Sequence, residues 1–283
     1  MAVNIMAEHL IPFGVKIDLD LRNDLRDEDI QVLREMFLEH HLIVFPKQRL
    51  SYEQQQKFIA CFGPVLDSGK EFKLVSNVVE GAALGSVELG LHSDLSYTSD
   101  PYLGISLHAI EVDDGRTSTF FQDNTRAYYM LTEERKNELK DCKVRMVFTS
   151  YTSKRNTYDP ELPSYIHPLI ATNPMSGQPI LFVNELHAAE IIGLPAEESK
   201  ILLDELCAAA RVGNIYEHIW QTGDLVFWDN RALAHGRGAV SDKPRTLQRV
   251  VMARSGPRDL NPDFEIADLD YGNGGRLKLR KKQ

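Results

Sequence analysis

Hydrophobic and polar residues follow a helical period near the start of the chain and then a shorter, strand-like pattern. Apolar residues recur at helical spacing among charged ones and predict a helix from Asp27 to His40. The apolar run at 41–46 ends in proline and predicts a buried strand. Ser51 and Gln54 form a capping box, which predicts a second helix ending near Phe62-Gly63.

The remainder of the chain alternates between short strand-like runs and helical inserts. We predict strands at 104–111, 117–122, 144–150, 213–220, 224–228 and 248–254, and helices at 125–140 and 195–210. Glycines punctuate the stretch from about 64 to 90, which predicts a mobile loop that covers the active site. Many short strands with helices outside them predict a mainly β fold with a double-stranded β-helix core, a cupin-like jelly roll.

Composition narrows the class of protein. A length of 283 residues with ordinary hydrophobic and charged content predicts one domain spanning 1–283. The net charge of −9 disfavours nucleic acid as a partner, and we expect the basic tail at about 275–283 to be solvated. Three scattered cysteines without a C-x-x-C pair indicate reduced thiols. Without a signal segment or a long apolar run, the chain is expected to be cytoplasmic and not membrane-bound.

Two short segments far apart in the sequence carry candidate metal ligands. His92 and Asp94 are two residues apart, so in a strand they would point to the same face. His235 follows a predicted buried strand and a polar turn at 229–231. Two imidazoles and one carboxylate that leave other positions open are the ligand set of non-haem Fe(II) oxygenases.

Two arginines follow the second histidine. Arg245 lies ten residues beyond His235, and Arg249 lies four residues further on. Residues four apart share a face in a strand, so both side chains can enter the same interior. A guanidinium group binds a carboxylate through two parallel hydrogen bonds, which suits the anchoring of an acidic cosubstrate.

At these residues the chain resembles the taurine/2,4-dichlorophenoxyacetate dioxygenase family of Fe(II)- and 2-oxoglutarate-dependent oxygenases. The resemblance runs through most of the chain in the family's order, at 41–46, in the following helix that ends at 62–64, and at 92–111, 119–131, 167–184 and 220–254. It implies Fe(II), 2-oxoglutarate and O2 as cofactor and cosubstrates, with release of succinate and CO2.

Carried over by position, the family's metal ligands, which are also its catalytic residues, correspond to His92, Asp94 and His235. The resemblance assigns Arg245 to the distal carboxylate of 2-oxoglutarate and Thr119 to the same group, with Thr117 as a nearby competitor. Arg249 matches a position that contacts either the acidic group of the substrate or the cosubstrate, and the sequence leaves both roles open.

Departures from the family pattern bear on the substrate. Taurine-cleaving members supply a histidine and a tyrosine from the loop before the metal motif, whereas 64–91 contains neither here. An asparagine four residues before the first ligand is replaced by Glu88. These changes disfavour taurine. The carboxylate of Asp94 disfavours the related halogenases, in which a small residue frees that position for halide.

The sequence therefore predicts a dioxygenase that hydroxylates, and in some cases then cleaves, a small anionic substrate bearing a carboxylate or sulfonate. A natural-product oxygenase that hydroxylates or desaturates is the alternative within the family. A barrel that binds a metal or ligand without turnover is the alternative outside it. The identity of the substrate and the oligomeric state, including a homo-oligomer, stay open.

Overall fold

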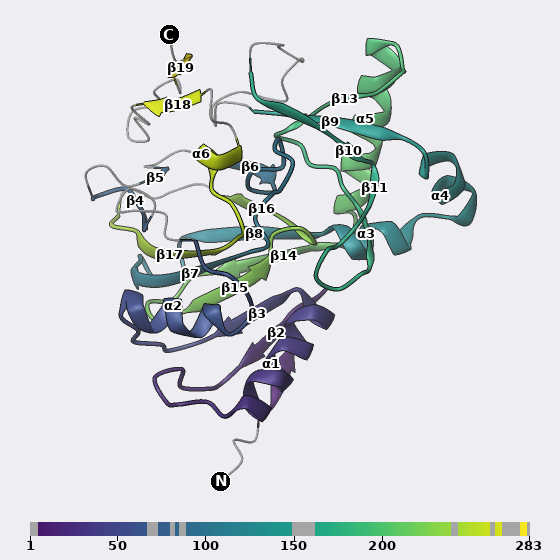
Figure 1. The fold of residues 1–283 in the computed structure, drawn as a ribbon. Helices are drawn as coiled ribbons and strands as arrows, with labels where there is room; N and C mark the ends of the chain where they lie inside the picture. The colour runs from purple at the N-terminus through teal and green to yellow at the C-terminus, as the bar shows by residue number, and fades with distance from the viewer. Residues whose placement is uncertain are drawn as a thin grey trace.

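The structure is a computed structural model that describes residues 5–66, 73–79, 83–84, 89–148, 162–238, 243–260, 264–267 and 278–281. Two mostly antiparallel sheets face each other at its centre (Figure 1). The larger sheet has, in spatial order, β1 (Ala7–His9), β2 (Val15–Ile17), β3 (Leu42–Phe45), β15 (Leu225–Asp229), β7 (Gly104–Glu111), β17 (Thr246–Met252), β4 (Leu74–Ser76) and β5 (Ala83–Leu84). The smaller sheet has β14 (Ile215–Ile219), β8 (Ser118–Asp123), β16 (Leu233–Arg237) and β6 (Leu89–His92).

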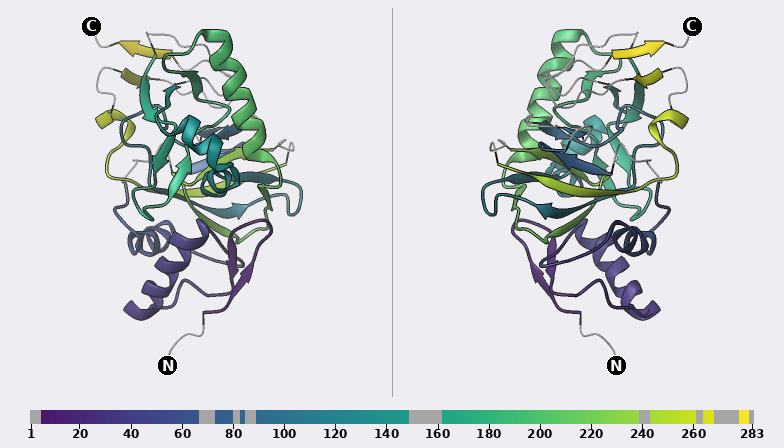
Figure 2. Two further views of the ribbon diagram at one scale, coloured as in Figure 1. Left: turned by 90° about the vertical axis from the view of Figure 1, so that its right-hand side faces the viewer. Right: turned by 90° about the vertical axis from the view of Figure 1, so that its left-hand side faces the viewer.

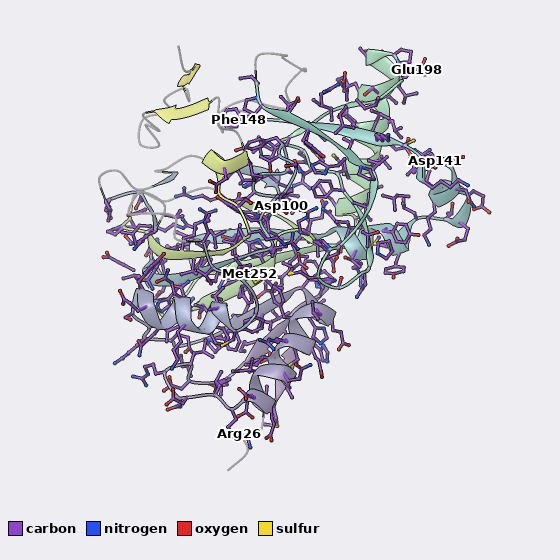
Figure 3. All side chains as sticks on the ribbon, in the orientation of Figure 1. Arg26, Asp100, Asp141, Phe148, Glu198 and Met252 are labelled. Atoms are coloured by element: carbon purple, nitrogen blue, oxygen red, sulfur yellow. The ribbon has the colours of Figure 1, made fainter. Side chains whose placement is uncertain are left out.

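Alternation along the strands of the larger sheet sends its side chains into two separate cores. On the inner face, residues such as Val226, Leu107 and Leu247 pack against Phe121 and Leu233 of the smaller sheet. The other face is covered by helices α1 (Asp27–His40) and α2 (Tyr52–Ala60), which lie below the sheet in Figure 1. Figure 3 shows Met252 on this helix-covered side of the sheet.

A third core lies on the other side of the smaller sheet. It is built from α3 (Asn124–Met130), α4 (Glu133–Leu139), α5 (Ala196–Arg211), β9 (Lys143–Val147), β11 (Ile170–Thr172), β12 (Pro179–Leu181) and β13 (Ala188–Ile191). Strand β10 (Ser164–Pro168) pairs with β9. The segment from α3 to α5 lies between β8 and β14 in the sequence and is called the insert below. Figure 2 shows α5 extending along the strands of this insert. Within it, α5 contacts β8 and α3 contacts β16, so the insert packs against the smaller sheet.

The mainly β fold with flanking helices is confirmed, and α1 has the predicted bounds. The prediction of one continuous helix at 125–140 is wrong, because two helices occupy this segment. Leu131 is extended, and the Thr132 hydroxyl accepts from the amide of Arg135 to begin a second helix, α4. Strand β16 is missing from the prediction because its sequence, Leu-Ala-His-Gly-Arg, has no β-branched residue.

Two predicted segments lie partly outside the described residues. In the predicted loop at 64–90, residues 67–72, 80–82 and 85–88 are not described, so a mobile cover stays a prediction. In the basic tail, residues 278–281 form β19 (Lys278–Lys281), which pairs with β18 (Phe264–Ala267) after the short helix α6 (Pro257–Leu260). No helix among the described residues is long and apolar enough to cross a membrane.

A buried histidine joins the insert to the loop after β6. The Nε2–H of His167 donates to the carbonyl oxygen of Ser96 at 2.8 Å. Burial, assisted by the charge of Arg231, lowers the pKa of His167 from 6.5 to about 4. As the pH falls below about 6.5, His167 therefore binds a proton in the unfolded chain, whereas in the folded chain it stays neutral until the pH approaches 4.

We expect this difference to remove stability between about pH 6.5 and pH 4, by up to about 1.4 kcal/mol per pH unit. Above the unfolded pKa of about 6.5, His167 is neutral in both the folded and the unfolded chain, so no stability is lost there. Urea unfolding at several pH values should show a shallower acid loss for His167→Gln, which keeps an N–H donor without the titration. Equal slopes in the variant and the parent protein would contradict this expectation.

Candidate metal and cosubstrate site

The three predicted metal ligands lie together between the two sheets. His92 ends β6, Asp94 follows it, and His235 is in β16; one potential ligand atom from each lies within 4.8 Å of the others. The Oδ1 atom of Asp94 is 3.1 Å from Nε2 of His92 and 3.8 Å from Nε2 of His235. Both imidazoles thus direct the same ring nitrogen toward one carboxylate.

Strand pairing and a buried amide produce this convergence. His235 is the direct cross-strand partner of His92. Asp94 lies beyond the end of β6, so the prediction that it shares a strand face with His92 is wrong. Instead, the Asp94 amide donates to Oδ1 of Asn230 at 2.9 Å, and Nδ2 of Asn230 donates back to the Asp94 carbonyl at 3.0 Å. Asn230 is fully buried and therefore holds the carboxylate-bearing turn in place.

Both imidazoles present a ring nitrogen that a metal ion could bind. The Nδ1–H of His92 donates to the carbonyl oxygen of Gly90 at 2.9 Å, which leaves the lone pair on Nε2. Burial and the neighbouring His92 lower the pKa of His235 to about 3. The ring of His235 lies against Trp228, with centroids 4.8 Å apart. A metal ion needs neutral imidazole donors of this kind.

Asp94 is held as a carboxylate by positive charge. Burial alone would raise its pKa, but the charge of Arg249 and the contacts with His92 and His235 outweigh burial and bring the pKa well below its usual range. Nη2 of Arg249 donates directly to Oδ2 of Asp94. The same guanidinium lies 5.6 Å from the ring centroid of Tyr102. Arg249 therefore belongs to the metal end of the site.

A second row of polar side chains crosses the smaller sheet two residues along the strands from the row that contains His235. Thr119 of β8 faces His218 of β14 on one side and Arg237 of β16 on the other. The indole Nε1–H of Trp220 donates to Oγ1 of Thr119 at 3.0 Å. Because that oxygen accepts from Trp220, its own O–H is available to donate to an anion.

Arg245 is a buried cation suited to binding an anionic group. Its side chain is 2% exposed, and its Nε and Nη1 atoms have no hydrogen-bond partner among the described residues. Burial, together with the charge of Arg237, lowers the pKa of Arg245 to about 9. An unpaired guanidinium is costly to bury, so this residue fits a bound carboxylate. Oγ1 of Thr117 is likewise buried and has no hydrogen-bond partner in the part of the chain that the structure describes, which keeps that residue as a competitor to Thr119.

Several residues of the site were not singled out from the sequence. Asn230 was interpreted only as part of a polar turn, and Trp220 only as part of a strand. His187, whose ring centroid is 5.9 Å from that of His92, comes from the insert, and no local pattern indicates it. Arg237 could have been found from the spacing His-x-Arg, because residues two apart in a strand share a face, but β16 was not predicted.

Comparison with known proteins identifies relatives across most of the chain. The family described as "Taurine catabolism dioxygenase TauD, TfdA family" matches residues 6–251. The alpha-ketoglutarate-dependent 2,4-dichlorophenoxyacetate dioxygenase of Cupriavidus pinatubonensis is 30% identical, over 88% of this chain and 97% of that protein. The pentalenolactone F synthase of Streptomyces arenae is also 30% identical, over 72% and 78%. The crystal structure of AAD-2 with Mn(II) and N-oxalylglycine superimposes with a TM-score of 0.77 at 26% identity, covering 90% of this chain and 98% of that one.

Proposed function

The chain belongs to the TauD/TfdA family of dioxygenases, and from that premise we propose that it hydroxylates a small organic anion while 2-oxoglutarate is converted to succinate and CO2. Members of the family are 2-oxoglutarate-dependent dioxygenases that use Fe(II) and O2, so the predicted enzyme class and cofactors are confirmed. The jelly-roll fold class is confirmed as well, because the fold matches that of a family member. The residue assignments and the substrate class are the proposal.

His92, Asp94 and His235 would hold the iron. The hydrogen bond at Nδ1 of His92, the low pKa of His235 and the ionised Asp94 would supply two nitrogen donors and one anionic oxygen donor. That donor set leaves one side of the metal open for cosubstrate and O2. When bound, Fe(II) supplies the redox chemistry, while the protein fixes the ligands and excludes water.

Arg245 and Thr119 would hold the distal carboxylate of 2-oxoglutarate. Arg245 offers buried N–H groups that no described residue pairs with, and Thr119 offers a hydroxyl hydrogen. Thr119 is two residues along β8 from Phe121, the cross-strand partner of His235, a separation of about 7 Å. A five-carbon diacid that chelates the metal through its keto end can span that separation with its second carboxylate.

The observation that supports an anionic substrate is the position of Arg249. Four residues of strand place its Cα about 13 Å from that of Arg245, so the two guanidinium groups serve different regions. Arg249 lies beside the metal ligand Asp94, where a substrate carbon must approach. A carboxylate or sulfonate bound there would direct the neighbouring C–H bond toward the iron. The 2,4-dichlorophenoxyacetate dioxygenase acts on a substrate of this kind, an aryloxyacetate.

A natural-product oxygenase is the second candidate. The similarity to pentalenolactone F synthase supports it, at the same identity as the aryloxyacetate enzyme but over a smaller share of the chain. The larger coverage favours the small-anion substrate.

The test measures succinate release by anaerobically Fe(II)-loaded protein after addition of 2-oxoglutarate and O2. The substrate panel contains aryloxyalkanoic acids, alkyl sulfonates and the methyl esters of the same acids. We expect succinate to rise with the acids and not with the esters. Arg249→Gln should lower kcat/KM for the best acid by roughly ten- to a hundredfold, as for the loss of a hydrogen bond to a charged group.

Arg254→Gln is the matched control, because Arg254 is exposed and pairs only with Asp100 among the interactions described. It should leave the preference for acids unchanged. Equal stimulation by acids and esters would reject the anionic substrate while leaving the enzyme class intact. Stimulation confined to larger, neutral natural products would favour the second candidate.

A further inference from the structure

Arg237 lies in the row of side chains to which the proposed function assigns the cosubstrate carboxylate. It is the direct cross-strand partner of Thr119, and both are buried. The next residue, Gly238, faces the other side of the sheet, because a Cβ atom there would lie 2.9 Å from Oγ of Ser118. Strand alternation therefore directs Arg237 toward the inner face.

Arg245 reaches the same region from the opposite sheet. It precedes β17, whose inward residues Leu247 and Val251 share its face. The positive charge of Arg237 contributes to the lowered pKa of Arg245, so the two guanidinium groups are close enough to repel each other. A carboxylate bound between the two guanidinium groups would accept charge-assisted hydrogen bonds from both.

We propose that Arg237 is a second cosubstrate-binding cation, which with Arg245 holds the distal carboxylate of 2-oxoglutarate from the side opposite to His218. This inference rests on the assignment of Thr119 and Arg245 to that carboxylate. It adds a residue that sets affinity and selectivity for dicarboxylates. The product succinate keeps the distal carboxylate, so Arg237 strengthens the binding of both.

The selectivity follows from charge. A 2-oxo acid with no second carboxylate can chelate the metal but offers no distal carboxylate to either arginine. Discrimination against pyruvate should therefore depend on Arg237 as well as on Arg245. The proposed function assigns the primary substrate to the region around Arg249. Binding of that substrate should therefore not depend on Arg237.

The experiment measures dissociation constants for 2-oxoglutarate, succinate and pyruvate by anaerobic titration of the Fe(II)-loaded protein. Arg237→Met removes the charge at similar length. We expect 2-oxoglutarate and succinate to bind roughly ten- to a hundredfold more weakly, with pyruvate little changed. KM for the primary substrate should stay constant. Arg116→Met, at an exposed arginine in the turn before β8, should bind all three as the parent protein does.

Arg237→Lys provides a second variant that keeps the positive charge. Lysine cannot form the two parallel hydrogen bonds of a guanidinium, so affinity for 2-oxoglutarate should fall between the parent and Arg237→Met. Thermal unfolding without ligand separates folding from binding. A purely structural Arg237 would lower Tm and leave the dissociation constants unchanged, which overturns the proposal. If the parent protein binds no 2-oxoglutarate at all, the proposed function fails first.

Discussion

Asp94→Ala should abolish Fe(II)-dependent succinate formation, and His92→Ala should do the same. Each variant removes one of the three proposed metal donors, and Asp94→Ala also leaves Arg249 facing two imidazoles without the carboxylate of Asp94. We expect a loss of more than about a hundredfold, above the range for residues that only support a metal ligand. Succinate release and Mn(II) binding followed by electron paramagnetic resonance are the measurements.

The control for this prediction is Asp100→Ala. Asp100 lies in the same loop and pairs with Arg254 near the surface, an interaction worth at most about 1 kcal/mol. Its loss should leave metal binding and turnover unchanged. Undiminished succinate formation in both Asp94→Ala and His92→Ala would contradict the assignment of the metal site.

Arg245→Met should weaken 2-oxoglutarate binding by roughly 2–5 kcal/mol, the cost of breaking a desolvated charge pair. That cost corresponds to an increase in the dissociation constant of roughly thirtyfold to several thousandfold. The same change should not lower the free energy of unfolding of the ligand-free protein, because it removes a buried cation whose Nε and Nη1 have no partner among the described residues. Isothermal titration and urea unfolding measure the two quantities.

A loss of binding without a loss of stability makes the prediction specific. A structural arginine would lose stability and binding together, whereas a ligand-binding arginine loses binding alone. Arg254→Met, at an exposed position just beyond the same strand, is the control and should change neither quantity. An unchanged dissociation constant for 2-oxoglutarate in Arg245→Met would reject its role in cosubstrate binding.

Local patterns in the sequence were sufficient for the elements that depend on neighbouring residues. The helical spacing from Asp27 onward and the Ser51 capping box predicted the starts of α1 and α2, because both signals lie within a few residues of chain. The same local reasoning failed at Leu131, where an extended residue separates two helices that share one helical pattern. It also failed at β16, whose strand is stabilised by pairing with β8 and β6 and not by its own composition.

The chemical types of the site residues were readable from the sequence, but their arrangement was not. The order His92, Asp94, His235 and the four-residue spacing of Arg245 and Arg249 indicated a metal and a bound acid. The mechanism first suggested for bringing His92 and Asp94 together, a shared strand face, is wrong. Asn230, from 136 residues further along the chain, positions Asp94 instead.

The sequence by itself determined which donor atoms and charges this protein has, and the family to which it belongs. Only the tertiary structure decided that His235 pairs with His92, and that Thr119 lies beside Arg237. The physical reason is that strand alternation specifies which face a side chain takes, but not which distant strand lies next to it. That choice is made by burial of the two inner faces against each other, which fills the interior and encloses Arg245.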